Sequence, residues 1–471
     1  MLPFHAKIKK NFFAKGIFNM GRTENRVLKK NFKKDIVSFF KAQHHFLPNF
    51  IDELGRIKDP RNGSYTTYDI SEILYTVIMK NNCNLTSMQD MTEKFNEETI
   101  VQNICKILGK EEKEFLPHYI TINECLERLD PKELEKLRIK MIRSLIRKRT
   151  FEQARFLGKY WAVIVDATGL FHFKEKHCKH CLKKTYHKGT AEEYSHYYHN
   201  VLEAKIVLGD TLILSIATEF IENEKEDVKK QDCERNAFKR LAKKIKKAFP
   251  QLPICILGDS LYACEPVFEL CRENAWSYLI RYKDGSIPTL AEDYKSIKKL
   301  GEHEEIAWIE EIMHKRKARE NKTHKIKWVS DISYGKQFLT VMDLKIEQEG
   351  AENQTFQWIT DLKIMGKTAA EFAAMGRKRW KIENEAFNIQ KNYRYDIQHA
   401  NSLDYQAMKN HYLLTQLADI LMQLYETGTK KLREIKRTIK NISSDLLKSL
   451  EQELTEEDIF IVKKRTSISV S

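Results

Sequence analysis

Proline and glycine are scarce in this chain, and long apolar segments are absent. Nine prolines and 17 glycines among 471 residues exclude collagen-like and low-complexity chains. No stretch of about 18 uncharged apolar residues occurs, and the N-terminus lacks a sustained apolar core before a small-residue cleavage site. The sequence contains neither a Walker loop nor a G-x-G-x-x-G motif. These absences predict a soluble, unexported protein that has no membrane partner and needs no nucleotide.

Cysteines are few and scattered. The chain has nine, an odd number, and most stand singly within apolar segments, as Cys105, Cys125 and Cys255 do. Disulfide frameworks are instead typical of short secreted chains with an even number of cysteines. The pattern therefore predicts a reduced compartment.

Positive charge is in surplus. Lys and Arg number 81 against 66 Asp and Glu, which gives a formal net charge of +15. Such a surplus attracts polyanions, so nucleic acid is the first partner to consider. Residues 1–34 hold ten basic residues and a single acid, Glu24. This N-terminal arm is either a solvated, disordered tail or a phosphate-binding segment.

Residues 35–157 carry the signals of helices. Ser87, Thr121 and Asp130 are each followed three positions later by an acid, a pattern that marks helix starts. Between these starts, apolar residues recur at the i, i+3 and i+4 spacing of amphipathic helices. We predict a helical domain here and assign DNA binding to it.

After residue 157 the pattern changes to short apolar runs rich in β-branched residues, separated by helical segments. Three strands, a helix, a strand, a helix and a strand form the order of the ribonuclease-H-like fold, a mixed α/β sheet with flanking helices. Residues 158–283 are therefore predicted to form the first part of such a core. Its strands are expected at residues 161–169, 200–209, 211–221, 253–260 and 276–283, and its helices at 227–249 and from 260 to about 274.

The C-terminal half is expected to interrupt and then complete this core. Helical periodicity is lost over residues 284–366, where three polar-flanked apolar runs predict a β-rich insertion. Residues 367–426 return to helical periodicity and are expected to form the second part of the core. Residues 427–471 predict a basic helical tail.

Three carboxylates stand at places where metal chemistry is plausible. Asp166 ends the first expected strand, Asp259 ends the strand after the long helix, and Glu383 lies in a helix after the insertion. Acids at the ends of neighbouring parallel strands project toward one edge, where a flanking helix can add a third. Such oxygen ligands suit Mg²⁺ or Mn²⁺ and phosphodiester chemistry. The alternative is that each Asp is an ordinary turn residue or helix cap.

The segments around these acids, VIVDATG, LGDSLYA and RWKIENEAFN, resemble the DDE transposases of insertion sequences, specifically the IS4-like branch with a β-rich insertion before the glutamate. Further similar segments extend the resemblance over most of residues 50–425. The resemblance implies metal-dependent DNA cleavage at transposon ends and strand transfer into target DNA. It also implies Mg²⁺ or Mn²⁺ as cofactor, double-stranded DNA as partner, a homodimer on DNA, and a bacterial-type cytoplasmic, nucleoid-associated location.

The resemblance also assigns roles in the glutamate helix. Arg379 lies four residues before Glu383, so it would either hold a phosphate beside the metals or form an ordinary ion pair. The branch motif calls for a tyrosine three residues before that arginine and a lysine seven after the glutamate, where this chain has Gly376 and Gln390. Lys391 and Arg394 are the nearby candidates for the phosphate contact. Glu385 competes as third ligand but would lie about 200° from Glu383 around a regular helix.

A second group of candidate ligands lies in the segment FHFKEKHCKHCLKKTYHKG. Cys178 and Cys181 form a C-x-x-C pair, and His187 follows nearby with several other histidines. Two cysteines with one or two histidines can build a tetrahedral Zn²⁺ site. The alternative is a basic, His-rich loop along DNA phosphates, with both cysteines reduced and unliganded.

Two rival functions remain at this point. The first is a nuclease of the same fold that hydrolyses DNA without strand transfer. The second is a catalytically decayed or domesticated DNA-binding protein.

Trp308, Trp328 and Trp358 of the insertion are candidates either for stacking on an extruded base or for core packing.

Overall fold

The computed structural model describes residues 33–225, 228, 230–312, 320–434, 437–464 and 468. The described residues form two compact units. The first contains residues 154–166 and 238–383, and the second contains the described parts of residues 17–153, 167–237 and 384–471. Strand β1 (Trp161–Phe173) passes from the first unit into the second after Asp166. None of the described helices is long and apolar enough to cross a bilayer.

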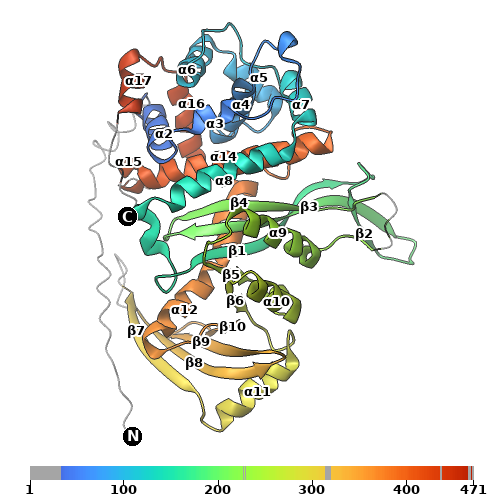
Figure 1. Cartoon of the computed structure of the whole chain (residues 1–471), viewed down its shortest axis with the longest axis vertical. Helices are drawn as coiled ribbons and strands as arrows, with labels where there is room; N and C mark the ends of the chain where they lie inside the picture. The colour runs from blue at the N-terminus through green and yellow to red at the C-terminus, as the bar shows by residue number, and fades with distance from the viewer. Residues whose placement is uncertain are drawn as a thin grey trace. The chain divides into compact units, whose positions relative to one another are not determined.

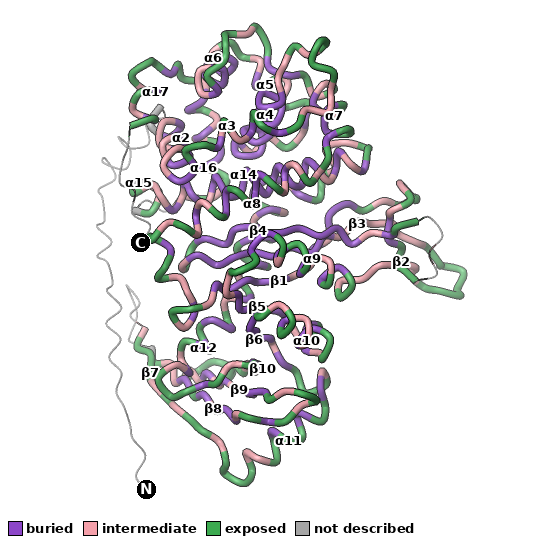
Figure 2. Tube along the Cα trace, viewed as in Figure 1, coloured by how far each residue is buried: buried purple, intermediate pink, exposed green. Residues whose placement is uncertain are grey.

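The first unit is organised around a mixed sheet (Figure 1). Its strand order is β1, β5, β6, β10, β9, β8 and β7, with β1, β5 and β6 parallel and the rest antiparallel. The apolar residues of β5 are buried, as expected for a strand covered on both faces (Figure 2). The strands other than β1 are β5 (Ile254–Gly258), β6 (Ser277–Arg281), β7 (Glu304–Ile312), β8 (Glu320–Tyr334), β9 (Gln337–Gln348) and β10 (Gln354–Thr360).

Helices flank this sheet near the positions that the apolar periodicity predicts, with three differences. Helix α9 was expected from residue 227 but begins at Glu234, since residues 230–233 are not helical. Helix α11 and strand β7 lie within the insertion, where only three strands were predicted. Strand β1 continues to Phe173, so Asp166 lies inside the strand and not at its end. The helical elements are α9 (Glu234–Ala248), which begins in the second unit, η3 (Ser260–Tyr262), α10 (Glu265–Glu273), α11 (Pro288–Lys299), α12 (Gly366–Lys378) and the π-helix η4 (Ile382–Phe387).

The second unit contains the predicted N-terminal helices. Ser87 with Asp90 forms a capping box, and Asp130 caps the helix that starts at Pro131, both as expected. The start expected at Thr121 is wrong, because that helix begins at Tyr119 and is capped by His118. The helices are α2 (Lys33–Phe46), α3 (Phe50–Gly55), η1 (Gly63–Tyr65), α4 (Ile70–Asn82), α5 (Met88–Phe95), α6 (Glu98–Leu108), α7 (Tyr119–Arg128), α8 (Pro131–Ile146) and η2 (Arg149–Ala154).

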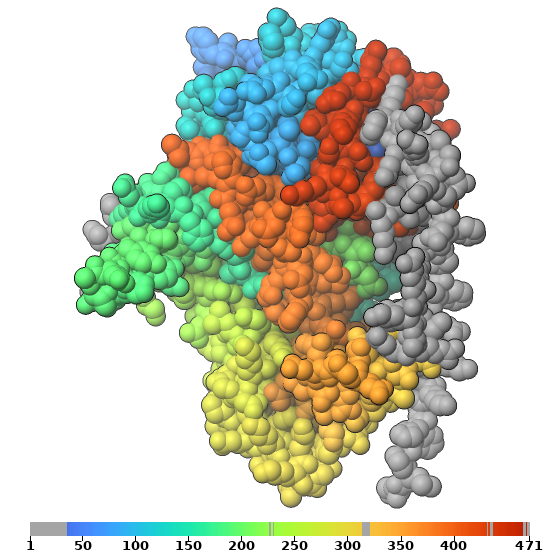
Figure 3. Space-filling model, turned by 180° about the vertical axis from the view of Figure 1, so that it is seen from behind, coloured from blue at the N-terminus to red at the C-terminus, as the bar shows by residue number. Residues whose placement is uncertain are grey.

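The C-terminal helices complete the same unit. Buried helix α14 packs against α2, α4, α7 and α8, and α16 and α17 pack against α2. Figure 3 shows the N-terminal helices of this unit, in light blue, beside the C-terminal helices, in red, and α16 packs against α6. Segments at opposite ends of the sequence therefore share one core. These helices are α13 (Asn388–Asn392), α14 (Tyr405–Gly428), α15 (Lys430–Glu434), α16 (Ile439–Leu450) and α17 (Glu456–Lys463).

The predicted hairpin is also present in this unit. Strands β3 (Tyr194–Leu208) and β4 (Leu212–Ile221) pair through a turn at Gly209, whose φ of 79° suits glycine. Strand β2 (Leu182–Tyr186) pairs antiparallel with the other end of β3. The predicted fold class, a mixed α/β sheet of ribonuclease-H-like order with a helical N-terminal region, is confirmed.

Three expectations fall wholly or partly on residues outside the described ones. Residues 1–32 of the basic N-terminal arm are not described. Neither are Asp227, where a helix was expected to begin, or residues 435–436 of the basic C-terminal segment. The C-terminal tail is helical over its described elements.

Candidate active site

The strand register of the first unit brings Asp166 and Asp259 together. Strands β1 and β5 pair in parallel up to Ile164 and Leu257. Continuing that register by two residues places Asp166 beside Asp259, at the spacing of neighbouring strands of about 4.8 Å. Laterally adjacent residues of a parallel pair also point to the same face. The two carboxylates, 93 positions apart in the sequence, are therefore neighbours at one sheet edge.

A tight turn fixes the Asp259 side chain. Its Oδ1 accepts a hydrogen bond of 2.8 Å from the backbone N–H of Leu261, which caps the short helix η3. The preceding Gly258 lies against the buried ring of Tyr262, where an added Cβ would approach that ring to 3.0 Å. The glycine therefore allows β5 to end directly beneath the turn. Asp259 is both a cap and a candidate ligand, so the two interpretations of this residue do not exclude each other.

Arg379 links Asp166 to Glu383. Its Nη1 lies 2.7 Å from Glu383 Oε1 and 3.8 Å from Asp166 Oδ2. The two carboxylates are therefore no farther apart than the sum of these two distances. The arginine side chain is 10% exposed, whereas that of Glu383 is 48% exposed. The structure thus brings all three predicted carboxylates and the predicted arginine into one neighbourhood.

Glu383 lies in a π-helix, not in a regular α-helix. The π-helix η4 spans Ile382–Phe387, separated by three residues from the end of α12 at Lys378. Short π-helical turns occur often at functional sites, because the wider turn changes the direction of its side chains. The angle of about 200° expected between Glu383 and Glu385 does not apply here, because it assumes regular α-helical geometry. Glu385 is exposed and makes an interaction of its own.

Sequence analysis missed Arg281, which ends the third parallel strand. Strands β5 and β6 pair up to Gly258 and Ile280, so the next residues in register are Asp259 and Arg281. The Arg281 guanidinium lies 5.6 Å from the Trp358 ring centroid, and its buried Nη1 has no hydrogen-bond partner among the described residues. Burial, together with the nearby charge of Arg379, lowers the pKa of Arg281. Only the register of β6 would have revealed this residue, because its sequence context, YLIRYK, carries no motif.

The donor set fits divalent cations. Asp166, Asp259 and Glu383 offer hard carboxylate oxygens, which Mg²⁺ and Mn²⁺ prefer. Arg379 already places one cationic group between two of these carboxylates. The chemistry of these three side chains therefore suits divalent cations.

The tyrosine position of the branch motif is filled differently. Gly376 lies in α12 against the indole of Trp358, and an added Cβ would lie 2.5 Å from its Cε2 atom. A tyrosine cannot occupy this position unless Trp358 moves. Trp358 is 2% exposed, so the indole fills the space next to the helix one turn before Arg379.

We expect Gly376→Ala to lower the thermal unfolding midpoint. Helix propensity alone predicts a gain of about 1 kcal/mol, but overpacking against the indole costs about 1 to 3 kcal/mol. Gly366→Ala is the matched control in the same helix, because its Cβ would meet only ordinary contact at 3.8 Å. Adding Trp358→Leu should restore stability to Gly376→Ala. A midpoint that rises in Gly376→Ala would contradict this packing argument.

The residues after η4 do not supply the expected lysine. Gln390 is fully buried, and its Nε2 donates to Gln416 and Asp419. Arg394 is 3% exposed, with its guanidinium held by Glu426 at 2.5 Å and Ser443 at 3.2 Å. This packing does not fit the DNA-contacting role predicted for Arg394. Lys391 is half-buried and remains a predicted phosphate contact.

The insertion tryptophans are mostly core residues. Trp328 and Trp358 are 1% and 2% exposed, which rules out stacking on a base without rearrangement. Trp308 is half-buried and stacks on His324 with a ring separation of 4.7 Å. An aromatic residue that sequence analysis overlooked is Trp380, which is 54% exposed and adjoins Arg379.

The predicted Cys/His ligand set is only partly assembled. Cys178 and Cys181 lie together with His199. His187 is exposed in a turn and does not belong to this group. The prediction that named His187 as a ligand is therefore wrong, and His199 takes its place. This cluster lies in the second unit and is considered separately below.

Comparisons with known proteins identify the family of the chain. Residues 157–418, more than half of the sequence, match the family model described as "Transposase DDE domain", and residues 51–142 match the model described as "DDE_Tnp_1-associated". No curated protein matches the chain. A cryo-EM structure of a piggyBac transposase synaptic complex with hairpin DNA is 11% identical with a TM-score of 0.42, over 88% of this chain and 80% of that one. That likeness is too weak to carry an argument. The chain belongs to the transposase DDE domain family, whose members generally use divalent metal ions, and it is an enzyme of DNA transposition.

Proposed function

We propose that Asp166, Asp259 and Glu383 are the ligands of catalytic divalent cations, Mg²⁺ or Mn²⁺, for DNA cleavage and strand transfer. One observation carries this proposal. The β1 and β5 register places the two aspartates side by side, and a single nitrogen of Arg379 contacts both Asp166 and Glu383. Bound ions of this kind would activate water or a 3′ hydroxyl and stabilise the leaving oxygen of an in-line phosphoryl displacement.

The protein side chains have separate roles in this reaction. Arg379 can release Glu383 and donate two parallel N–H bonds to a phosphate at the sheet edge. Arg281 brings a second guanidinium, next to Asp259 in register. Two cationic groups at this edge would hold the scissile phosphate in place while its charge develops. The rigid parallel strands keep these groups at fixed spacing.

We further propose that the substrates are the two transposon ends and a target duplex, bound by a homodimer. The surplus of fifteen positive charges supports a DNA partner. Strand exchange at two ends requires two active sites, which two protomers would supply. The IS4-like branch remains our assignment from the glutamate helix, with its tyrosine and lysine positions altered at Gly376 and Gln390. The mass of the protein on paired end duplexes measures the protomer number.

A cleavage assay tests the proposed function. DNA that flanks the gene is incubated with the full-length protein and Mg²⁺, beside the Asp259→Ala variant, and the products are resolved by length. Nicks at the element ends followed by joined products support transposition. Cleavage without joined products would indicate a hydrolysis-only nuclease. Salt-sensitive binding with no cleavage by the wild type would indicate a decayed DNA-binding protein.

Arg281→Gln is expected to reduce the cleavage rate by about 10-fold to 100-fold, because a charge-assisted contact to phosphate is lost while the stem still covers Trp358. Arg272→Gln is the control, since this arginine of α10 is half exposed and pairs only at the surface with Glu269. The assay is the initial rate of end cleavage at saturating DNA. Equal cleavage rates for Arg281→Gln and wild type would show that Arg281 does not contribute to holding the phosphate.

A further inference from the structure

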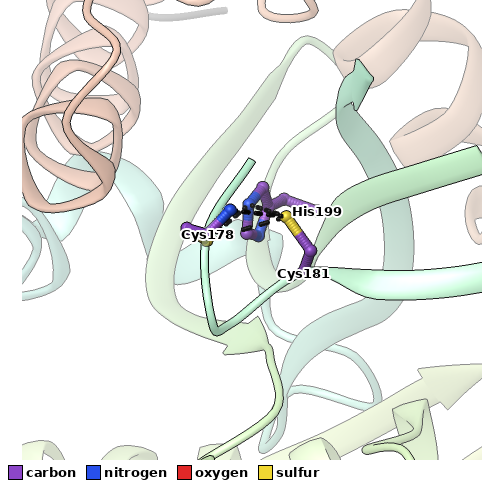
Figure 4. A group of neighbouring side chains, drawn as sticks. All are labelled: Cys178, Cys181 and His199. Atoms are coloured by element: carbon purple, nitrogen blue, oxygen red, sulfur yellow. Dashed lines mark hydrogen bonds between the residues drawn. The ribbon is translucent and has the colours of Figure 1, made fainter. Parts of the chain in front are cut away.

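A compact group of three metal-binding side chains lies in the second unit (Figure 4). Cys178 and Cys181 come from the loop between β1 and β2, and His199 comes from the middle of β3. The two sulfur atoms are 3.6 Å apart, and each lies 3.4 Å from Nε2 of His199. All three donor atoms therefore face a common point.

These separations match one face of a tetrahedral zinc site. Zinc lies about 2.3 Å from a thiolate sulfur and about 2.0 to 2.1 Å from an imidazole nitrogen. Tetrahedral angles then put two sulfurs about 3.8 Å apart and a sulfur and a nitrogen about 3.5 Å apart. The observed triangle of 3.6, 3.4 and 3.4 Å agrees with these values to within about 0.2 Å, the tolerance for a metal site.

The loop backbone favours thiolates at this point. The backbone N–H groups of His180 and Cys181 donate to the Cys178 sulfur. The backbone N–H of Cys178 in turn donates to Cys181 Sγ at 3.4 Å. Turns of the C-x-x-C type that hold a metal present their N–H groups to the sulfurs in this way, because each bond stabilises a charged thiolate.

The surroundings exclude solvent and fix the imidazole. His199 is fully buried and Cys181 is 4% exposed. The ring of Tyr405 from α14 stacks on the His199 ring at 4.3 Å, and Cys178 packs against the apolar cluster that contains Phe171 and Tyr405. A closed, preorganised site of this kind is typical of structural zinc.

A neighbouring histidine, His180, lies beside this group but is not among the donor atoms that come together. Its Nδ1 lies 2.8 Å from the Asn223 carbonyl oxygen; since a carbonyl only accepts, Nδ1 donates and carries the proton. Its Nε2 is then the free lone pair, and a ring nitrogen bound to a carbonyl is the usual outer support of a zinc-binding histidine. The Asn223 side chain also donates to the Cys181 carbonyl at 2.8 Å, so Asn223 forms hydrogen bonds with both His180 and Cys181 of the loop. A water molecule would complete the coordination, unless the His180 ring moved toward the three donor atoms.

We infer that Cys178, Cys181 and His199 bind a structural Zn²⁺ ion that pins the loop after β1 to strand β3. This site shares no residue with the carboxylate site, and it does not depend on the proposed catalytic roles. Residues 174–181 contain no helix or strand, yet they lead into the β2 and β3 arm. The metal would supply the rigidity that this short segment cannot obtain from regular hydrogen bonding.

Metal analysis of the full-length protein tests the inference. The protein is purified without a histidine tag and dialysed, and its zinc content is measured by plasma mass spectrometry. We expect about one ion per chain in the wild type, and at least a tenfold loss in Cys178→Ser, Cys181→Ser and His199→Asn. Cys233→Ser and His187→Asn, which change a cysteine and a histidine outside the cluster, should retain the ion.

Cobalt spectroscopy keeps the inference testable when a variant fails to fold. The wild-type protein, stripped of zinc and kept reduced, is titrated with Co²⁺. Tetrahedral coordination with two thiolates gives intense visible d–d bands and sulfur-to-cobalt charge transfer, both lost on adding Zn²⁺. A reduced wild type that carries no zinc and gives no such bands would overturn the inference. So would a native Cys178–Cys181 disulfide, or zinc retained in Cys178→Ser.

Discussion

Glu383→Gln is expected to slow end cleavage by at least about a thousandfold, because loss of one carboxylate ligand removes several kcal/mol of metal-derived stabilisation from the transition state. Glu385→Gln, two residues away and also exposed, should stay within about threefold of wild type. The two substitutions are chemically identical and nearly isosteric. Both variants lose one negative charge, so a difference between their cleavage rates reports the position of the lost carboxylate and not the change in net charge.

The measurement is the single-turnover rate of cleavage on an end duplex, with DNA affinity followed in parallel. Affinity should be preserved in both variants, because phosphate contacts elsewhere dominate binding. Asp166→Asn and Asp259→Asn should show losses as large as that of Glu383→Gln. If Glu385→Gln loses activity and Glu383→Gln does not, the third ligand has been assigned to the wrong side of the π-helix.

Local chemistry in the sequence was enough to predict the core strands and the carboxylates. Short β-branched runs that end in an acid predicted β5 with Asp259, and the hairpin was marked by its Gly-Asp turn. These features depend on residues adjacent in sequence, so a periodicity argument can find them. The length of β1 was underestimated, because Asp166 and Gly169 looked like a strand end although the strand continues to Phe173.

Features that depend on packing between distant segments could not be predicted. The π-helix at Glu383 leaves no mark in the apolar spacing, and α11 was missed among polar residues of the insertion. Arg281, which we propose as a phosphate contact, comes next to Asp259 only through the register of β6. His199 replaced His187 as a partner of the C-x-x-C pair because the fold of β3, not proximity in sequence, decides which imidazole faces the sulfurs.

Arg379 offers the second large expected effect. Arg379→Lys should reduce cleavage by about 100-fold even though the charge is retained, because an ammonium cannot make the two parallel N–H bonds of a guanidinium to phosphate. Arg377→Lys serves as control, since this neighbouring arginine is exposed and its guanidinium lies 5.5 Å from the Phe356 ring centroid. If Arg379 served only as an ion-pair partner of Glu383, the lysine variant would cleave at nearly the wild-type rate.

A stability measurement separates the two roles of Arg379 further. In the metal-free protein this arginine offsets the charges of Asp166 and Glu383, so Arg379→Ala removes the cationic group that these two carboxylates share. We expect Mg²⁺ to raise the thermal midpoint of Arg379→Ala more than that of wild type. Without the competing guanidinium Mg²⁺ should bind more tightly, and a ligand that binds only the folded state stabilises it more when it binds more tightly. If Mg²⁺ raised the thermal midpoint of both proteins equally, Arg379 and the cations would not compete for the same carboxylates.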